Sequence, residues 1–217
     1  MTKLCIFDLD GTLVNSLYDL ADAMNYALVK NGFEPHDREK YRFMVGNGIS
    51  CLADKAMVIP KGMATEEQKK QVLADFNVFY DKHCMDKTAP YYGITDVLDE
   101  LDKRNIKYAV MSNKPDEYAK IIVEKLFPKN KFAAIWGKRE NFERKPSPQA
   151  VLALIDEVGI DKNDCLYIGD SDVDVYTAQN AELKCCAVSW GFRPKKELSD
   201  AGAEFIADKP SEILTQL

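Results

Sequence analysis

The sequence predicts an α/β fold: a doubly wound parallel sheet, or Rossmann-like core, that carries an inserted helical cap domain. Short apolar runs that end at polar or glycine-bearing turns indicate the strands, and they lack the in/out alternation of half-exposed strands. Helical patterns separate most of these runs, which favours parallel strands joined by helices. Between the first run and residue 91 only helical patterns occur, which indicates an insertion.

The predicted strands are Leu4–Phe7, Ile106–Met111, Phe132–Trp136, Cys165–Ile168 and Cys185–Trp190. The predicted helices of the core are Ile94–Arg104, Pro115–Leu126, Pro148–Val158 and Asp172–Ala181. In doubly wound sheets the ligand crevice lies beyond the carboxyl ends of the strands. We therefore expect the polar turns that follow these strands to open onto one crevice.

Residues 1–14 and 92–217 are assigned to the α/β core, and residues 15–91 to the helical cap. The predicted helices of the cap are Leu17–Lys30 and Glu66–His83, with shorter pieces at Glu39–Met44 and Ile49–Met57. No strand is predicted within it. A helical block inserted after the first strand would cover the crevice as a lid, which excludes water and selects substrates.

Composition narrows the class of protein. The chain has 217 residues, of which 46% are hydrophobic and 29% charged, and its net charge of −6 argues against a nucleic-acid binder. No apolar run approaches a membrane span, and the first one is broken at Asp8, too early for a secretory signal. The six cysteines show no zinc or redox spacing and are expected to be reduced. We expect a cytoplasmic monomer or homodimer that binds neither nucleic acid nor membrane.

Asp8 and Asp10 lie two residues apart at the end of the first predicted strand. Two carboxylates 4 Å apart repel by about 4 kcal/mol in an intermediate dielectric. A hard divalent cation relieves this repulsion, and carboxylate oxygens suit Mg²⁺. The alternative is a turn rich in Asp and Gly, which Asp10-Gly11-Thr12 alone would favour.

A second acidic group follows the fourth predicted strand at the start of a helix. It consists of Asp170, Asp172 and Asp174, and the first and last are one helical turn apart. Acids at a helix start also cap free amides and complement the helix dipole, but three exceed what capping needs. Because both acidic groups should face one crevice, they predict a metal site.

Lys145 and the segment Ser112-Asn113-Lys114-Pro115 supply cationic and anion-binding groups. Lys145 precedes a helix start at Ser147-Pro148, the wrong end of the dipole for a cation. Carboxylates and a phosphate beside it would stabilise its ammonium. The alternative is a solvated surface lysine. The Ser112 segment ends a strand and opens a helix, which makes either an anion site or an ordinary cap.

Four motifs together resemble those of the haloacid dehalogenase-like hydrolases. They are Asp8-Leu9-Asp10-Gly11-Thr12-Leu13, Ser112-Asn113, Lys145-Pro146 and Gly169-Asp170-Ser171-Asp172-Val173-Asp174, in the family's order. The helical insertion resembles that superfamily's small cap. Arg42 with Val45-Gly46-Asn47-Gly48, Tyr91-Tyr92-Gly93-Ile94 and Trp190-Gly191-Phe192-Arg193 resemble the phosphoglycolate phosphatase branch.

The resemblance implies a role for each motif. Asp8 attacks phosphorus and becomes an aspartyl-phosphate, and Asp10 serves as general acid and base. Ser112 and Lys145 hold the transferring phosphoryl group. Mg²⁺ is held by Asp8, the Asp10 main-chain carbonyl and Asp170, while Asp174 supports the metal or orients Lys145. The implied substrate-binding residues are Gly11, Thr12, Arg42, Gly46, Asn47, Gly48, Asn113 and Lys114.

These roles imply a Mg²⁺-dependent phosphatase of small phosphate monoesters, with phosphoglycolate as the leading substrate. A phosphosugar mutase of β-phosphoglucomutase type, a pyrophosphatase and a nucleotidase are alternatives. Asp10 disfavours a carbon–halogen hydrolase, because the family's dehalogenases carry no acid at that position. A phospho-receiver signalling module is a remote alternative, since receivers have no long helical insertion after the first strand.

Overall fold

The computed structural model describes residues 1–59 and 62–217. The chain divides into two compact units, which are Met1–Asn15 with Pro90–Leu217, and Ser16–Ala89. Two short strands, β2 (Val14–Asn15) and β5 (Ala89–Pro90), lie where the chain passes from one unit to the other. We call the first unit the core and the second the helical unit.

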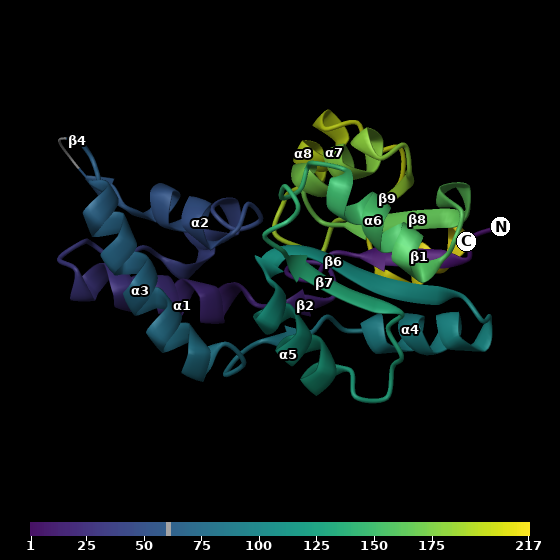
Figure 1. The fold of residues 1–217 in the computed structure, drawn as a ribbon, viewed down its shortest axis with the longest axis horizontal. Helices are drawn as coiled ribbons and strands as arrows, with labels where there is room; N and C mark the ends of the chain where they lie inside the picture. Colours follow the sequence, from purple (N-terminus) through teal and green to yellow (C-terminus); the bar gives the residue numbers. More distant parts are fainter. Residues whose placement is uncertain (60–61) are drawn as a thin grey trace. The chain divides into compact units, whose positions relative to one another are not determined.

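The described part of the core is built on a six-stranded sheet (Figure 1). Its strands are β1 (Leu4–Phe7), β6 (Lys107–Pro115), β7 (Ala134–Lys138), β8 (Cys165–Gly169), β9 (Lys184–Val188) and β10 (Ile206–Ala207). Their order is β10-β9-β8-β1-β6-β7, and every neighbouring pair is parallel. The predicted α/β class with a parallel sheet is therefore confirmed.

Helices cover both faces of this sheet, as a doubly wound fold requires. Helices α4 (Ile94–Lys103) and α5 (Asp116–Leu126) lie on one face, and α6 (Gln149–Val158) and α7 (Asp172–Asn180) on the other (Figure 1). Leu4 and Ile6 of β1 belong to the same buried cluster as Leu154 of α6. Because the sheet is buried on both faces, β1 is apolar throughout and shows no alternation.

The register brings the ends of the central strands to one level. Phe7 pairs with Val110 of β6 and with Ile168 of β8, and the Asp8 amide donates a hydrogen bond to the Ile168 carbonyl at 2.8 Å. The turns after β1, β6 and β8 therefore leave the same edge of the sheet. This edge carries the acidic and basic residues that the sequence singled out.

Some elements of the core were not predicted from the sequence. Besides β10, they are α8 (Lys195–Asp200) and the 3₁₀ helices η2 (Lys162–Asp164) and η3 (Pro210–Thr215). Strand β10 has two residues, too few for any periodic pattern, and it forms only by pairing with β9. The six cysteines, all within the described residues, form no disulfide.

The helical unit contains α1 (Leu17–Lys30), η1 (Arg38–Phe43), α2 (Ile49–Ala56) and α3 (Glu66–His83). Helices α1 and α3 pack together, and the Asp75 carboxylate of α3 accepts hydrogen bonds from Lys30 and Asn31 at 2.7 and 2.9 Å. The expectation that this segment holds no strand was wrong. Strands β3 (Val58–Ile59) and β4 (Gly62–Met63) pair antiparallel, but each is too short to leave a pattern in the sequence.

Among the residues that the structure describes, no helix combines the length and the apolar character needed to cross a membrane.

Candidate active site

Three buried carboxylates and one buried ammonium meet at the carboxyl edge of the central strands. Carboxylate oxygens of Asp8, Asp170 and Asp174 all lie within 4.8 Å of one another. The Lys145 Nζ atom is 2.9 Å from Asp8 Oδ1 and 2.7 Å from Asp174 Oδ1. The turns after β1 and β8 therefore converge on one point, as the sequence predicted. We call the three carboxylates the acidic cluster; Lys145 lies against it.

The acidic cluster carries more negative charge than Lys145 balances. Burial raises the pKa of Asp8 to about 6, against the opposing effect of Lys145 and with help from the neighbouring Asp174. Burial and the repulsion of Asp174 and Asp8 raise the pKa of Asp170 well above its ordinary value. Burial disfavours the charge on Lys145, but Asp174 and Asp8 outweigh this and raise the pKa of its ammonium. An additional cation would relieve the cluster.

Both oxygens of the Asp170 carboxylate are held by donors from other turns. Thr12 Oγ1 donates to Oδ1 at 3.1 Å, and the Phe192 amide donates to Oδ2 at 2.7 Å. The turn after β9 also reaches the first acidic turn, because Trp190 Nε1 donates to the Thr12 carbonyl at 3.1 Å. The resemblance to known phosphatases singled out Trp190 to Arg193 without a role. The structure assigns this turn the role of holding Asp170.

We expect Gly191→Ala to weaken divalent-cation binding, because a Cβ there would overlap the Asp170 side chain and the Gly11 carbonyl. Displacing a group that orients a ligand should reduce Mg²⁺ affinity about 10-fold or more. The overlap should also cost about 1–3 kcal/mol of stability. Titration calorimetry of the metal-free protein measures the first effect and urea unfolding the second.

A matched control is Gly159→Ala. Gly159 has a positive φ, which Gly191 does not, so alanine strains the Gly159 backbone, but nothing lies within 4 Å of the added carbon. This variant should lose some stability and keep its Mg²⁺ affinity. Equal affinity losses in the two variants would contradict a specific role for the turn after β9.

Asp174 carries two functions in one side chain. Its Oδ2 accepts hydrogen bonds from the Ser171 amide and hydroxyl at 3.1 and 2.6 Å, which forms the capping box of α7. Its Oδ1 faces Lys145 and accepts a hydrogen bond from the Tyr167 hydroxyl at 3.2 Å. Asp174 therefore caps α7 and contacts Lys145 with the same carboxylate. Tyr167 was not identified from the sequence, because a tyrosine within a buried strand is typical of the hydrophobic core.

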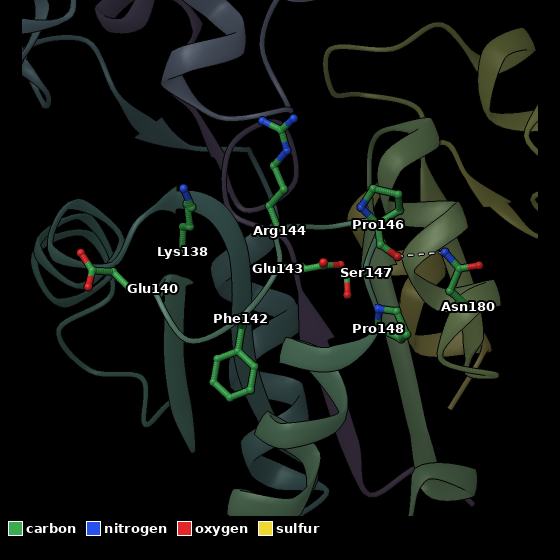
Figure 2. A pocket seen from close by; sticks show the side chains of 9 residues that line it. All are labelled: Lys138, Glu140, Phe142, Glu143, Arg144, Pro146, Ser147, Pro148 and Asn180. Atoms are coloured by element: carbon green, nitrogen blue, oxygen red, sulfur yellow. Dashed lines mark hydrogen bonds between the residues drawn. The ribbon is translucent and has the colours of Figure 1, made fainter. Parts of the chain in front are cut away.

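The main chain around Lys145 is fixed from two sides. The Asn113 side chain accepts a hydrogen bond from the Lys145 amide at 2.9 Å and donates one to its carbonyl at 3.2 Å. On the other side, Asn180 Nδ2 donates to the Pro146 carbonyl at 2.9 Å, as Figure 2 shows. Asn113, an implied substrate-binding residue, thus anchors the loop between β7 and α6 that carries Lys145.

An open cavity of about 840 Å³ lies beside this segment (Figure 2). Its lining residues are Lys138, Glu140, Phe142, Glu143, Arg144, Pro146, Ser147, Pro148 and Asn180. No member of the acidic cluster lines it, so the cavity is a separate feature of this part of the chain.

Two of the predicted acids, Asp10 and Asp172, face basic side chains and do not belong to the acidic cluster. The Asp10 carboxylate lies 3.0 and 3.1 Å from Lys114 Nζ, so its oxygens face an ammonium rather than the three clustered carboxylates. Asp172 is partly exposed and lies 3.8 Å from Arg193 Nε. The mutual repulsion that suggested an Asp8–Asp10 metal site is therefore relieved in part by a lysine.

The remaining predicted residues divide between the units. Ser112 is buried at the end of β6, where its hydroxyl accepts a hydrogen bond from the Lys114 amide at 3.3 Å. Gly11 has a φ of +94° and packs on Asp170. The others lie in the helical unit, on η1 or on the loop that leads to α2: Arg42, Gly46, Asn47 and Gly48.

The donor set suits a magnesium ion. The clustered groups are carboxylate oxygens, which are the ligands that Mg²⁺ prefers, and the raised pKa values of Asp8 and Asp170 mark an excess of negative charge. The cluster offers no sulfur or imidazole ligand among the described residues, so a soft metal is disfavoured.

Comparison with known proteins gives one matching family. The family model described as haloacid dehalogenase-like hydrolase matches residues 5–188. This span includes every residue of the acidic cluster and of the segment from Ser112 to Lys114.

Individual relatives cover nearly the whole chain. A phosphoglycolate phosphatase from Rhodospirillum rubrum is 32% identical over 212 residues, 96% of this chain and 88% of its own length. An N-acetylmuramic acid 6-phosphate phosphatase from Pseudomonas aeruginosa is 27% identical over 99% of this chain and 94% of its own length. A crystal structure of a predicted phosphoglycolate phosphatase from Haemophilus somnus superposes with a TM-score of 0.91 at 27% identity, covering 99% of this chain and 97% of its own.

Proposed function

The chain belongs to the haloacid dehalogenase-like hydrolases, and from this premise we propose that it hydrolyses small phosphate monoesters through an aspartyl-phosphate on Asp8. It is a phosphatase, with relatives among the phosphoglycolate phosphatases. The observation that carries the mechanism is the placement of Lys145 Nζ between Asp8 and Asp174, at 2.9 and 2.7 Å, within a cluster of three buried carboxylates.

In the first step, one Asp8 oxygen attacks phosphorus and the bond from phosphorus to the ester oxygen breaks. The Asp10 carboxyl group gives its proton to that ester oxygen, so the leaving group departs as an alcohol. In the second step, Asp10 takes a proton from water while the water oxygen attacks phosphorus. The Asp8–phosphorus bond breaks, and free phosphate and the original Asp8 are restored.

Lys145 and Ser112 stabilise the phosphoryl group during both transfers, since their charge and hydroxyl lie at the same strand edge as Asp8. Asp8, the Asp10 main-chain carbonyl and Asp170 would hold Mg²⁺, with Asp174 in support. A bound Mg²⁺ would neutralise these carboxylates and offset negative charge on the transferring phosphoryl group.

Phosphoglycolate is the substrate that the relatives support best, and the P. aeruginosa enzyme supports a sugar phosphate as the second candidate. The proposal includes substrate contacts from Gly11, Thr12 and Asn113 in the core. It also includes substrate contacts from Arg42 and from residues 46–48 of the helical unit. Cytoplasmic location and a monomeric or homodimeric state stay predictions.

Phosphate release across a panel of phosphomonoesters tests this function. The panel contains phosphoglycolate, N-acetylmuramic acid 6-phosphate, a hexose phosphate, a nucleotide and pyrophosphate, each with Mg²⁺ and with EDTA. We expect phosphate release only with Mg²⁺, fastest on phosphoglycolate. If a hexose phosphate is isomerised without phosphate release, the function is that of a mutase and not of a phosphatase. Full activity in EDTA would contradict the metal requirement.

A further inference from the structure

The Asp10–Lys114 pair lies beside the acidic cluster, and its geometry bears on the acid–base step. Lys114 Nζ lies 3.0 Å from Asp10 Oδ1 and 3.1 Å from Oδ2, so both carboxylate oxygens face one ammonium. The Lys114 side chain is 2% exposed, whereas that of Asp10 is 12% exposed. The carboxylate is therefore the more accessible member of the pair, and the ammonium lies behind it.

The main chain that carries Lys114 packs closely against β7. The pairing of β6 with β7 shifts register between Met111 and Pro115, so the residues between them leave the regular alternation of a strand. Three successive polar side chains are buried in this stretch, namely Ser112, Asn113 and Lys114. A Cβ on Gly137 of β7 would overlap the Lys114 carbonyl, so the main chains of β7 and β6 approach closely at this point.

The main chain of the partner residue, Asp10, lies in a hydrogen-bonded turn. Asp10 sits in a tight turn in which the Gly11 amide donates to the Val14 carbonyl at 2.8 Å and the Leu13 amide to the Leu9 carbonyl at 3.0 Å. The contact of Lys114 Nζ with both oxygens restrains rotation of the Asp10 carboxylate about its side-chain bonds. A neutral side chain at position 114 would remove this restraint.

We propose that Lys114 is a positioning residue, which holds the Asp10 carboxylate in place for proton transfer to the ester oxygen and from water. This assignment rests on the proposed function, and it differs from the substrate contact that the resemblance implied for Lys114. The ammonium acts through Asp10 and does not itself touch the substrate.

The leaving group provides a test that a merely structural role would not pass. An alkyl phosphate needs a proton on its departing oxygen, whereas the phenolate of p-nitrophenyl phosphate leaves without one. With Lys114→Met, we expect kcat/KM on the best alkyl phosphate of the panel to fall roughly 100-fold, the scale of general acid catalysis. We expect a fall of only a few-fold on p-nitrophenyl phosphate. Equal falls on the two substrates would overturn the inference.

Pre-steady-state kinetics gives a second readout. Both substrates share the second step, in which Asp10 accepts a proton from water. With p-nitrophenyl phosphate, Lys114→Met should therefore show a burst of up to one equivalent of p-nitrophenolate per enzyme, followed by slow turnover. The absence of a burst, with a uniformly slow first step, would contradict a role through Asp10.

A double-variant cycle separates action through Asp10 from direct substrate contact. Once Asp10→Asn has removed the acid, adding Lys114→Met should cause no further loss on the alkyl phosphate. A further loss equal to that of Lys114→Met alone would overturn the proposal. The double variant also removes both charges of the buried pair, so folding is less affected than in Lys114→Met.

Lys103→Met is the matched control, because Lys103 has the same side chain at an exposed position of α4 in the core. It should retain wild-type rates on both substrates. A wild-type protein that releases no phosphate would overturn the proposed function together with this inference. An active wild type with equal losses in Lys114→Met would overturn the inference alone.

Discussion

The Asp8→Asn variant is expected to lose at least about 10³-fold in kcat, because a residue that forms the covalent intermediate has no substitute in the site. Asparagine keeps the shape of the side chain but offers no anionic oxygen to attack phosphorus. The measurement is phosphate release with saturating Mg²⁺ on the best substrate of the panel. Acid-quenched wild-type enzyme should carry a phosphoryl group on Asp8, and the variant should carry none.

The same variant should fold. The pH dependence of its stability, relative to wild type, should show the effect of the ionised Asp8 carboxylate on folding. The pKa of Asp8 is raised to about 6, above the ~3.9 of an unfolded chain, so folding favours the protonated form. That stabilisation is complete below pH ~4 and is lost as the pH rises through 6. Above pH 6 the ionised carboxylate therefore costs the metal-free protein about 3 kcal/mol.

Because asparagine carries no charge, Asp8→Asn in EDTA should be more stable than the wild type at pH 7.5. This advantage should shrink at pH 5, where the wild-type carboxyl group is mostly protonated in the folded state. Urea unfolding of both proteins at the two pH values measures the difference. A variant that is equally active, or that unfolds more easily at pH 7.5 than at pH 5 relative to wild type, would contradict this account.

Strands and helices of both units were predictable where their sequence patterns are local. Predicted bounds for Leu4–Phe7, Leu17–Lys30 and Glu66–His83 match β1, α1 and α3. The convergence of Asp8 and Asp170 was also predictable, since parallel strands direct their carboxyl ends to one edge. Polar residues directly after buried strands therefore carried much of the information about the site.

What the sequence could not supply was the partner of each polar side chain. Asp10 and Lys114 are far apart in the chain, so no local pattern signals their ion pair, and none signals the register shift in β6 beside it. The hydrogen bond from the Phe192 amide to Asp170 is made by the main chain, so it cannot be predicted from the type of side chain at position 192. Strands of two residues, such as β3 and β10, exist only through their neighbours.

Lys145→Met is expected to be strongly destabilising as well as nearly inactive. Lys145 Nζ contacts Asp8 and Asp174, and its side chain is only 2% exposed. Removing the ammonium leaves the three carboxylates of the cluster without their buried counter-charge. Breaking a buried ion pair from one side costs about 3–5 kcal/mol, so the metal-free variant should unfold at much lower urea than the wild type.

Turnover should fall by about 10²–10³-fold, because a charge that stabilises the transferring phosphoryl group is lost. Methionine retains most of the aliphatic length, so lost packing contributes little to either effect. Lys103→Met, an exposed lysine of the same unit, should change neither stability nor rate.

Two additions to the experiment assign the destabilisation to charge. Saturating Mg²⁺ should restore part of the stability of Lys145→Met, since a divalent cation supplies positive charge to the same carboxylates. Adding Asp174→Asn to Lys145→Met should also restore stability in EDTA, because the asparagine oxygen can still accept the Ser171 hydrogen bonds of the α7 capping box while one negative charge is gone. If neither addition raises the stability of the variant, the carboxylates do not share one electrostatic site, and the cluster could not serve as the phosphoryl-transfer centre.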